Sequence, residues 1–457
     1  MNENISIVIL AAGLGTRMRS KKPKVLHHAG GLSLIEHVVK MALAITTPDR
    51  IGVVVGHQAE QVRATVAATG VQFVEQAEQK GTGHAVKMCR AALARQDGWV
   101  VVLYGDCPML SASTIRRLID LQVGGGSAAT LIAATLAEPT GYGRVLLDQQ
   151  GNVLSIVEQK AATPEQLDIK LINSGIYCFR SELLWKHIDE IVPNNPAREF
   201  YLTDMAEILT RAGYAVTPMI VDDPLETLGI NNRVELAEVD RIFRQRKTRE
   251  LMLEGVTIEK PETVTIDSDV RIGMDTVIGP FAHILGRTVI GEDCSIGAGA
   301  IVHNSRIADR VAVLPLTIIH DSQIGSGAQV GPFARLRTEN RVDAGAHIGN
   351  FVELKKTHLG AGAKASHLAY LGDSEIGAKA NIGAGTITCN YDGVRKHQTK
   401  IGKGAFVGSN STLVAPVEVG EGSYIGAGSV ITQPVPDHAL AIGRGRQVIK
   451  EGWVAKW

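Results

Sequence analysis

The second half of the chain carries an apolar residue at every sixth position. From Ile266 to Val302 this interval holds without a slip, and the residues in between are small or polar. A period of six fits neither an amphipathic helix (3.6) nor a simple strand (2), so it predicts a structural repeat. With a few five-residue steps the pattern continues to Thr388, and after an interruption at 389–400 it resumes from Ile401 to Ile431.

One apolar residue in six cannot stabilise a free-standing segment. Ordering six residues costs about 9 kcal/mol, whereas burying one Ile returns about 1.5–3 kcal/mol. Successive coils must therefore stack, so that each covers the one below and shares backbone hydrogen bonds with it. Hexapeptide periods are typical of a parallel β-helix.

The first half shows a different pattern, in which short apolar runs alternate with amphipathic segments. Ile5–Leu10 is a β-branched run that predicts a buried strand, and Ser33 with Glu36 forms a capping box that begins a helix through about residue 45. Further strands are predicted at 51–55, 71–74 and 99–104, and further helices at 59–69 and 81–94. This alternation indicates a parallel α/β sheet with ligands at the carboxyl ends of its strands.

Length and composition narrow the class of protein. At 457 residues the chain is too long for one ordinary domain, and its formal net charge of zero implies no bulk attraction to nucleic acid or membrane. Its five cysteines have neither metal-site nor disulfide-framework spacing, which suits a reducing cytosol. No run approaches 18 apolar residues. We therefore expect a cytoplasmic protein without a signal peptide, a membrane span or a nucleic-acid partner.

A charged segment joins the two halves. Residues 232–254 predict a long exposed helix that ends near Gly255. Its basic run from Arg241 to Arg249 is interspersed with acidic residues, which favours a solvated helix face over a nucleic-acid site.

The loop after the first predicted strand is rich in glycine. By itself such a loop is equally well a tight β–α connection. Here Arg17 lies in the loop and Lys24 follows seven residues later, so backbone amides and two cations can converge on a polyphosphate. The spacing matches neither a P-loop nor a dinucleotide fingerprint.

This loop resembles the signature of sugar-phosphate nucleotidyltransferases. The matching residues run Leu10-Ala-Ala-Gly13, then Gly15-Thr-Arg17-Met, then Pro23-Lys24. Further segments match the uridyltransferase branch of that family in order: Gln76, Gly81-Thr82, Tyr104-Gly105-Asp106, Gly141-Tyr142-Gly143, Glu158, Asn173 and 229–233. One departure is Leu14, where basic residues are frequent.

The hexad ladder resembles the hexapeptide-repeat acyltransferases, which implies a left-handed β-helix with three hexads per coil and a homotrimer. Together the halves resemble the bacterial bifunctional uridyltransferases and acetyltransferases. The resemblance implies an α/β Rossmann-like nucleotidyltransferase domain at 1–233, a linker helix at 234–254 and a hexapeptide-repeat acetyltransferase domain at 255–457. It also implies acetyl transfer from acetyl-CoA to glucosamine-1-phosphate, then uridylyl transfer from UTP to N-acetylglucosamine-1-phosphate. The product, UDP-N-acetylglucosamine, feeds peptidoglycan and lipopolysaccharide precursor synthesis.

For the first site the resemblance assigns charge neutralisation to Arg17 and Lys24. It assigns Mg²⁺, a hard cation that prefers oxygen ligands, to Asp106 and Asn231. The residues implied to hold UTP and the sugar nucleotide are Leu10, Ala11, Ala12, Gly13, Lys24, Gln76, Gly81, Thr82, Tyr104, Gly105, Asp106, Gly143, Glu158, Asn173 and Asn231.

For the second site the repeat itself predicts two columns. Arg337 and Lys355 each follow an apolar rung and lie three hexads apart, so they stack about 4.8 Å from one another as a phosphate clamp. His367 and three small residues, Ala384, Ser409 and Ala427, each lie two past a rung and share another column, provided that the interruption is a pure insertion.

The acyltransferase resemblance then assigns roles to these columns. His367 becomes the general base, in the segment 365–373, where Ala369 replaces a frequent Thr. The residues implied to bind the sugar phosphate are Arg337, Lys355, Tyr370 and Asn381. Those implied to contact acetyl-CoA are Ala384, whose amide could face the oxyanion, and Asn390, Tyr391, Ser409, Ala427 and Arg444.

Two alternatives stay open. A non-catalytic regulatory protein can have the same two domains, as in some eukaryotic translation-initiation exchange factors, although such proteins usually lose catalytic residues that this chain retains. His303 and His320 also stack and could hold an interfacial metal, as in hexapeptide-helix carbonic anhydrases, but no third ligand stands in the expected relation.

Overall fold

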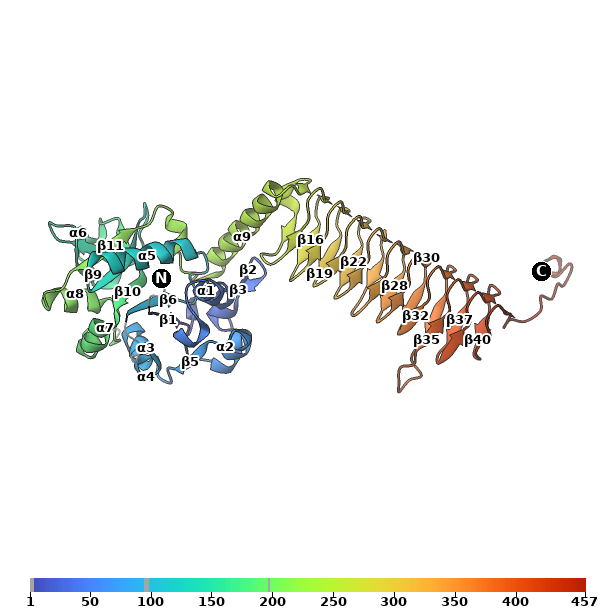
Figure 1. Ribbon diagram of the computed structural model, residues 1–457, viewed down its shortest axis with the longest axis horizontal. Coiled ribbons are helices and arrows are strands. Elements are labelled where there is room, and N and C mark those ends of the chain that lie inside the picture. The colour runs from blue at the N-terminus through green and yellow to red at the C-terminus, as the bar shows by residue number, and fades with distance from the viewer. Residues whose placement is uncertain (1–3, 94–97, 196–197) are drawn as a thin grey trace. The chain divides into compact units, whose positions relative to one another are not determined.

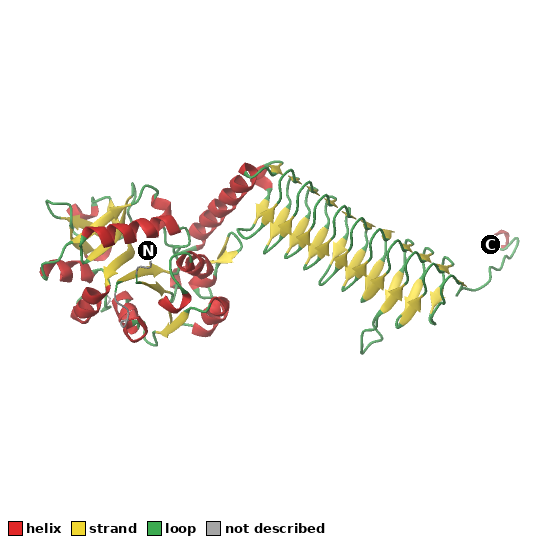
Figure 2. Cartoon of the chain, in the orientation of Figure 1, coloured by secondary structure: helices red, strands yellow, loops and turns green. Residues whose placement is uncertain are grey.

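The computed structural model describes residues 4–93, 98–195 and 198–457. It divides into two compact units, Met1–Arg241 and Ile242–Trp457 (Figure 1). Figure 2 shows that most helices belong to the first unit and that short strands make up the second. Among the described residues no helix combines the length and apolar character needed to cross a membrane.

The first unit is built on one sheet. Its main path is β11-β7-β10-β6-β1-β4-β5. The bounds are β1 (Ile5–Leu10), β4 (Ile51–Val55), β5 (Gln72–Glu75), β6 (Trp99–Tyr104), β7 (Ala129–Thr135), β10 (Leu171–Arg180) and β11 (Val216–Ile220). Side strands β8 (Arg144–Leu147) and β9 (Val153–Val157) and a small ribbon of β2 (His28–Ala29) and β3 (Leu32–Ser33) complete it.

The prediction of a parallel sheet is correct for β1, β4, β5 and β6, and β7 and β11 also pair in parallel, but β10 contradicts it. Strand β10 lies between β6 and β7 and runs antiparallel to both. The sheet is therefore mixed, because the chain enters β10 after the antiparallel β8–β9 pair rather than through a crossover helix.

Helices cover both faces of this sheet. The described helices of this unit are α1 (Leu34–Leu43), α2 (Ala59–Val66), α3 (Thr82–Met88), α4 (Arg90–Leu93), α5 (Ala112–Gly125), α6 (Pro164–Leu167), α7 (Ser181–His187) and α8 (Asp204–Arg211), and of these α6 buries none of its residues. Strand β1 is buried on both sides: Ile7 and Ile9 pack in one core cluster, with α1 and α5, while Val8 packs in the other, with α7 and α8.

Most of the predicted helix starts and ends agree with the structure. The capping box at Ser33 forms with both of its hydrogen bonds. The predicted helix at 59–69 ends as a 3-10 turn at Ala67–Thr69. The one predicted at 81–94 breaks at Cys89 into α3 and α4, and position 94 lies outside the described residues.

The second unit is a left-handed parallel β-helix (Figure 1). In residues 242–457 its short strands form three parallel sheets of 11, 10 and 9 strands. The first sheet contains β12 (Thr257–Ile258), β15 (Val277–Ile278), β18 (Ser295–Ile296), β21 (Ala312–Val313), β24 (Gln329–Val330), β27 (His347–Asn350), β30 (Lys364–His367), β33 (Asn381–Ile382), β36 (Phe406–Val407), β39 (Tyr424–Ile425) and β41 (Leu440–Ala441).

The second sheet contains β13 (Thr265–Ile266), β16 (His283–Leu285), β19 (Ile301–His303), β22 (Ile318–His320), β25 (Arg335–Leu336), β28 (Glu353–Lys355), β31 (Tyr370–Gly372), β34 (Ile387–Cys389), β37 (Thr412–Val414) and β40 (Val430–Ile431). The third contains β14 (Arg271–Ile272), β17 (Val289–Ile290), β20 (Arg306–Ile307), β23 (Gln323–Ile324), β26 (Arg341–Val342), β29 (His358–Leu359), β32 (Ser374–Ile376), β35 (Thr399–Ile401) and β38 (Val417–Val419).

The predicted rungs form the core of this β-helix. Ile266 pairs with Ile284 and Ile284 with Val302, so one coil takes three hexads, as expected. Every rung from Ile266 to Ile431 is buried. The six-residue period therefore corresponds to one face of the coil, and each of the three faces contributes one inward side chain.

Helix α9 (Arg233–Leu253) contains the point at which the two units divide. The prediction of an exposed helix needs correction in its second half. Lys247 and Leu251 are buried there. Lys247 pairs with Glu250 at 2.7 Å, and Arg244 pairs with Asp267 at 2.8 Å. Part of the basic run therefore serves internal ion pairs instead of forming a solvated face.

Candidate functional site

A cleft of about 430 Å³ opens at the carboxyl ends of β1 and β6. Twelve of the predicted residues line it: Leu10, Ala11, Ala12, Gly13, Arg17, Lys24, Gln76, Gly81, Thr82, Tyr104, Asp106 and Asn231. Gly105, between the lining residues Tyr104 and Asp106, donates its N–H to the Leu10 carbonyl at 2.9 Å. The structure thus brings together segments that are more than 200 residues apart in sequence.

The loop after β1 needs glycine at position 15. Gly15 has a φ of 60°, and a Cβ there would lie 2.6 Å from the Cβ of Lys24. A side chain would both strain the backbone and displace Lys24. The close approach of loop and lysine therefore sets where the Lys24 ammonium group lies.

Two cations and two oxygen ligands meet in this cleft. The Lys24 ammonium forms an ion pair with Asp106 and donates to Asn231 Oδ1 at 2.9 Å. Arg17 donates to the same Oδ1 at 2.8 Å. Because one ammonium reaches both oxygens, a single metal cation can also contact both.

The donor set suits a hard divalent cation. Asp106 offers a carboxylate and Asn231 an amide oxygen, the ligand types that Mg²⁺ prefers. No group of three His, Cys, Asp or Glu side chains able to hold a metal occurs among the described residues. Phosphate oxygens of a substrate are suitable further ligands for such a cation.

A buried amide stands at the other end of the cleft. Gln76 is 3% exposed, and its Nε2 donates to the Gly81 carbonyl at 3.1 Å and contacts His84 Nδ1 at 3.0 Å. Gly81 has a φ of 108°, and a Cβ there would lie 2.5 Å from the Phe200 carbonyl oxygen. The glycine lets α3 begin close against residue 200.

The predicted sugar residues gather beside Tyr104. The Asn173 N–H donates to the Gly143 carbonyl at 2.9 Å, and a Cβ on Gly143 would lie 3.4 Å from Glu158 Oε1. The Tyr104 ring packs against Gly175, whose N–H donates to Asn173 Oδ1 at 3.1 Å. Burial raises the pKa of Glu158 above its usual range, while a hydrogen bond with Thr203 opposes the rise.

Sequence reasoning missed several residues of this region. Gln79 and Glu199 line the cleft, and the Thr203 hydroxyl influences the pKa of Glu158. Burial, together with Glu207 and Glu158, raises the pKa of Asp204 to about 6. None of them belongs to a motif that we used; strand–helix packing brings them here from distant segments.

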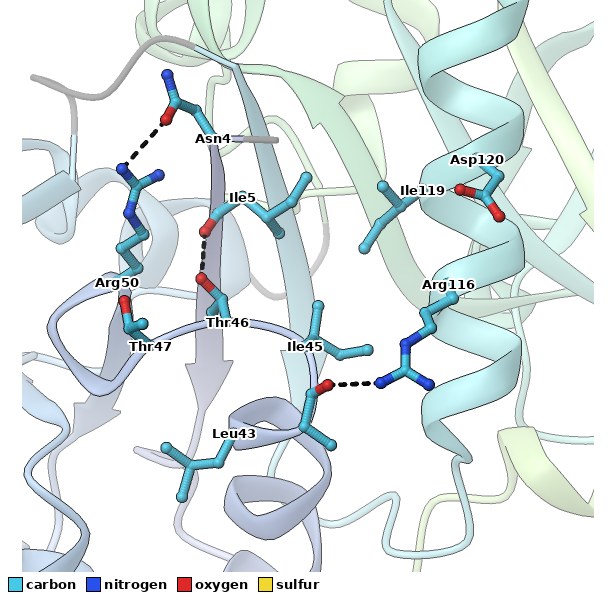
Figure 3. A pocket seen from close by; sticks show the side chains of 11 residues that line it. Asn4, Ile5, Leu43, Ile45, Thr46, Thr47, Arg50, Arg116, Ile119 and Asp120 are labelled. Carbon is cyan, nitrogen blue, oxygen red and sulfur yellow. Dashed lines mark hydrogen bonds between the residues drawn. The ribbon is translucent and has the colours of Figure 1, made fainter. Parts of the chain in front are cut away.

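A larger hollow, of about 700 Å³, lies at the opposite end of β1 (Figure 3). Arg50 donates there to Asn4 at 3.1 Å, and Arg116 donates to the Ala44 carbonyl at 2.7 Å. It contains none of the predicted site residues. The chemistry therefore concentrates in the smaller cleft.

In the β-helix the predicted cation column forms. Leu336 pairs with Leu354 across β25 and β28, so Arg337, directly after β25, and Lys355, the last residue of β28, occupy equivalent positions on neighbouring coils. Arg337 pairs with Glu353 at 2.9 Å and Lys355 with Asp373 at 3.7 Å. Tyr370 and Asn390 both lie close to Gly372, where a Cβ would be 2.6 Å from the Tyr370 hydroxyl and 2.8 Å from Asn390 Nδ2.

The histidine column also forms, on the sheet of β30 and β33. Ala365 pairs with Ile382, Ile382 with Val407 and Val407 with Ile425. Each column member lies two positions past one of these rungs: His367, Ala384, Ser409 and Ala427. The interruption is therefore an insertion loop, as the column required, between β34 and β35.

A single hydrogen bond orients the His367 ring. Its Nδ1 lies 2.7 Å from Asn350 Oδ1, on the neighbouring strand β27. Because that oxygen can only accept, Nδ1 carries the hydrogen and Nε2 keeps its lone pair. An imidazole held in this way presents a basic nitrogen to solvent.

The remaining predicted residues surround these columns. Asn381 begins β33 and pairs with Lys364 and Phe406. Tyr391 lies in the insertion loop and bridges to Lys396. The Arg444 side chain lies beside Gly428, directly after Ala427 in the histidine column.

The stacked histidines form a pair without a third metal ligand nearby. His303 and His320 pair across β19 and β22, and their ring centroids are 5.5 Å apart. In the part of the chain that the structure describes, no metal-binding group of three includes them.

Comparison with known proteins matches both halves. The family model of the MobA-like NTP transferase domain matches residues 7–162, and that of the bacterial transferase hexapeptide (six repeats) matches 269–304 and 398–433. The chain is 61% identical to a bifunctional protein GlmU from Solibacter usitatus, over 100% of this chain and 98% of that one. It is 51% identical to one from Koribacter versatilis and 45% identical to one from Shouchella clausii, each with at least 97% of both chains covered.

This similarity extends through both folds and both groups of polar residues. A relative 61% identical over the full length leaves no segment of this chain without a counterpart. With a nucleotidyltransferase fold in its first half and hexapeptide transferase repeats in its second, the chain belongs to the family of bifunctional GlmU proteins.

Proposed function

We propose that the chain makes UDP-N-acetylglucosamine through its two separate sites. The β-helix transfers the acetyl group of acetyl-CoA to glucosamine-1-phosphate. The α/β unit then joins N-acetylglucosamine-1-phosphate to the uridylyl group of UTP and releases pyrophosphate, providing a precursor for peptidoglycan and lipopolysaccharide. The observation that supports this most is that each fold gathers its own polar site while the whole chain matches bifunctional relatives. The non-catalytic alternative has no comparable support.

Uridylyl transfer needs positioning and charge neutralisation more than a base. The attacking group is a phosphate oxygen of the sugar phosphate, already an anion, which attacks the α-phosphorus of UTP as the bond to the β-phosphate breaks. Arg17 and Lys24 face that charge from the loop after β1. Asp106 and Asn231 hold Mg²⁺, which when bound neutralises phosphate charge. Gln76 and Gly81 hold the uridine, and Gly143, Glu158 and Asn173 hold the sugar.

Acetyl transfer does need a base, because the amine of glucosamine-1-phosphate is mostly protonated at neutral pH. His367 Nε2 accepts a proton from the amine, whose nitrogen then attacks the thioester carbon and displaces the CoA thiolate. Arg337 and Lys355 hold the sugar phosphate, and on binding they exchange their ion pairs with Glu353 and Asp373 for phosphate oxygens. The Ala384 amide faces the developing oxyanion.

The proposed assembly is a homotrimer formed by the β-helix. One corner of the coil carries a ladder of exposed apolar residues in the left-handed conformation, with φ between 48° and 60°: Phe281, Leu316, Phe333, Phe351 and Leu368. Gly299 takes the corresponding position in the coil between Phe281 and Leu316, and the four residues from Leu316 to Leu368 occupy successive coils. Bulky residues rarely adopt this conformation, and an exposed apolar ridge marks an interaction surface. A second copy of the chain covers it in our proposal, and His367 directly precedes one of its residues.

Three further assignments accompany this function. The boundaries 1–233, 234–254 and 255–457 separate the uridyltransferase domain, the linker and the acetyltransferase domain. The protein works in the cytoplasm, in line with five cysteines that are all free. Its other partners are its small-molecule substrates.

One incubation tests the whole proposal. The purified chain receives glucosamine-1-phosphate, acetyl-CoA, UTP and Mg²⁺, and the products are identified by mass spectrometry. UDP-N-acetylglucosamine supports both halves, and a single partial product supports one. No product at all contradicts the assignment and favours a scaffold role.

A further inference from the structure

The buried amide of Gln76 has its orientation fixed by two acceptors. Nε2 has two hydrogens, and they point to the Gly81 carbonyl at 3.1 Å and to His84 Nδ1 at 3.0 Å. In the described part of the chain no donor contacts Oε1 of this residue. Gln76 therefore presents an acceptor to any ligand in the cleft that it lines.

His84 can play this part only as a neutral ring. Burial and the nearby Lys80 and Lys87 lower its pKa, with Glu78 opposing them. At neutral pH the ring therefore has no charge, and Nδ1 can accept while Nε2 carries the hydrogen. The ring lies in the first turn of α3, half-buried, with its centroid 6.3 Å from that of Phe200.

We propose that His84 is a positioning residue that makes the first site select uracil over cytosine. The inference rests on the proposed use of UTP. Uracil carries a hydrogen at N3 and can donate it to Gln76 Oε1. Cytosine has a lone pair at N3, so its N3 and Gln76 Oε1 are both acceptors and cannot form a hydrogen bond. The two bases have the same size, so only this hydrogen-bond pattern separates them at N3.

The two hydrogen bonds from Gln76 Nε2 oppose a rotation of the amide that would exchange Oε1 and Nε2 and so present a donor to cytosine N3. A flipped Gln76 would place its oxygen against the Gly81 carbonyl, which can only accept, and against His84 Nδ1, which would have to take over the hydrogen carried by Nε2. Replacing His84 by an apolar residue removes one of these two restraints. The preference for UTP over CTP should then fall by roughly 2- to 12-fold, the contribution of one neutral hydrogen bond.

Three variants of the full chain test the proposal. H84L removes the acceptor, while H84N keeps an oxygen at the position of Nδ1. M88A, on an exposed position at the end of the same helix, is the control. The ratio of kcat/KM for UTP to that for CTP is measured by pyrophosphate release with N-acetylglucosamine-1-phosphate. We expect the ratio to fall in H84L and to stay at the wild-type value in H84N and M88A.

The outcomes separate the inference from the function on which it rests. A wild-type chain that turns over neither nucleotide overturns the proposed function and this inference with it. A wild-type chain that prefers UTP, with the same preference in H84L, overturns the inference alone. If circular dichroism shows that H84L is unfolded, H84N is compared with H84Q, whose amide reaches the Nε2 position instead. Equal ratios in that pair also overturn the proposal.

Discussion

Replacing His367 by Ala should separate catalysis from binding in the second site. His367 lies on the sheet of β30, whereas Arg337 and Lys355 follow strands of the next sheet and have their own acidic partners. The substitution therefore removes the base without touching the clamp. His367 is exposed and has one hydrogen bond, to Asn350, so the free energy of unfolding should change by less than about 1 kcal/mol.

The size of the expected loss of acetyl transfer in His367→Ala follows from the role of His367 as general base. A positioned general base contributes roughly 10²- to 10⁴-fold, so kcat should fall by that factor while the KM for glucosamine-1-phosphate stays near its wild-type value. Lys355→Ala is the matched comparison. It removes a charged hydrogen bond worth about 1.5–3 kcal/mol, which corresponds to a rise in KM of roughly 10- to 150-fold.

Two readouts decide between the roles. Release of CoA thiol gives the acetyl-transfer rate, and pyrophosphate release from UTP in the same preparation serves as the folding control. In the pH–rate profile the acidic limb reports protonation of the base, so it should flatten in His367→Ala and persist in Lys355→Ala. Near-normal turnover in His367→Ala, or an acidic limb that survives in it, would refute the assignment of the base.

Asp106→Ala should nearly abolish pyrophosphate release and leave CoA release unchanged, because an oxygen ligand is lost in one unit only; equal damage to both rates would point to misfolding instead. Phe333→Ser with Phe351→Ser breaks a ring pair whose centroids are 5.4 Å apart on the apolar ridge. It should lower the oligomer mass in light scattering and reduce acetyl transfer but not uridylyl transfer, and an unchanged mass would contradict the ridge as the interface. Asp204 has its pKa raised from 3.8 to about 6, so the folded chain binds the extra proton and stability falls as pH rises from about 4 to 6. Asp204→Asn should therefore raise the Tm at pH 7 but not at pH 4, and the same difference at both pH values would exclude this linkage.

The repeat shows how far a sequence can determine structure by itself. In a β-helix each residue stacks on its counterpart one coil away, so spacing along the chain converts directly into neighbours in space. That is why the columns of His367 and of Arg337 with Lys355 could be derived by counting, once residues 389–400 were treated as an insertion between Ala384 and Ser409. The capping box at Ser33 was equally readable, because both of its hydrogen bonds join residues within one turn.

The first unit depended on tertiary structure to a greater degree. Antiparallel β10 lies between β6 and β7, and no local sequence pattern predicts which two strands a given strand will pair with. Lys24 meets Asn231 across 207 positions, and His84 orients Gln76 only because Gly81 allows the chain to turn there. Motif resemblance named several of these residues, but which atoms bond was decided by how helices pack on both faces of the sheet. Such contacts have no period along the chain, so only the folded structure determines them.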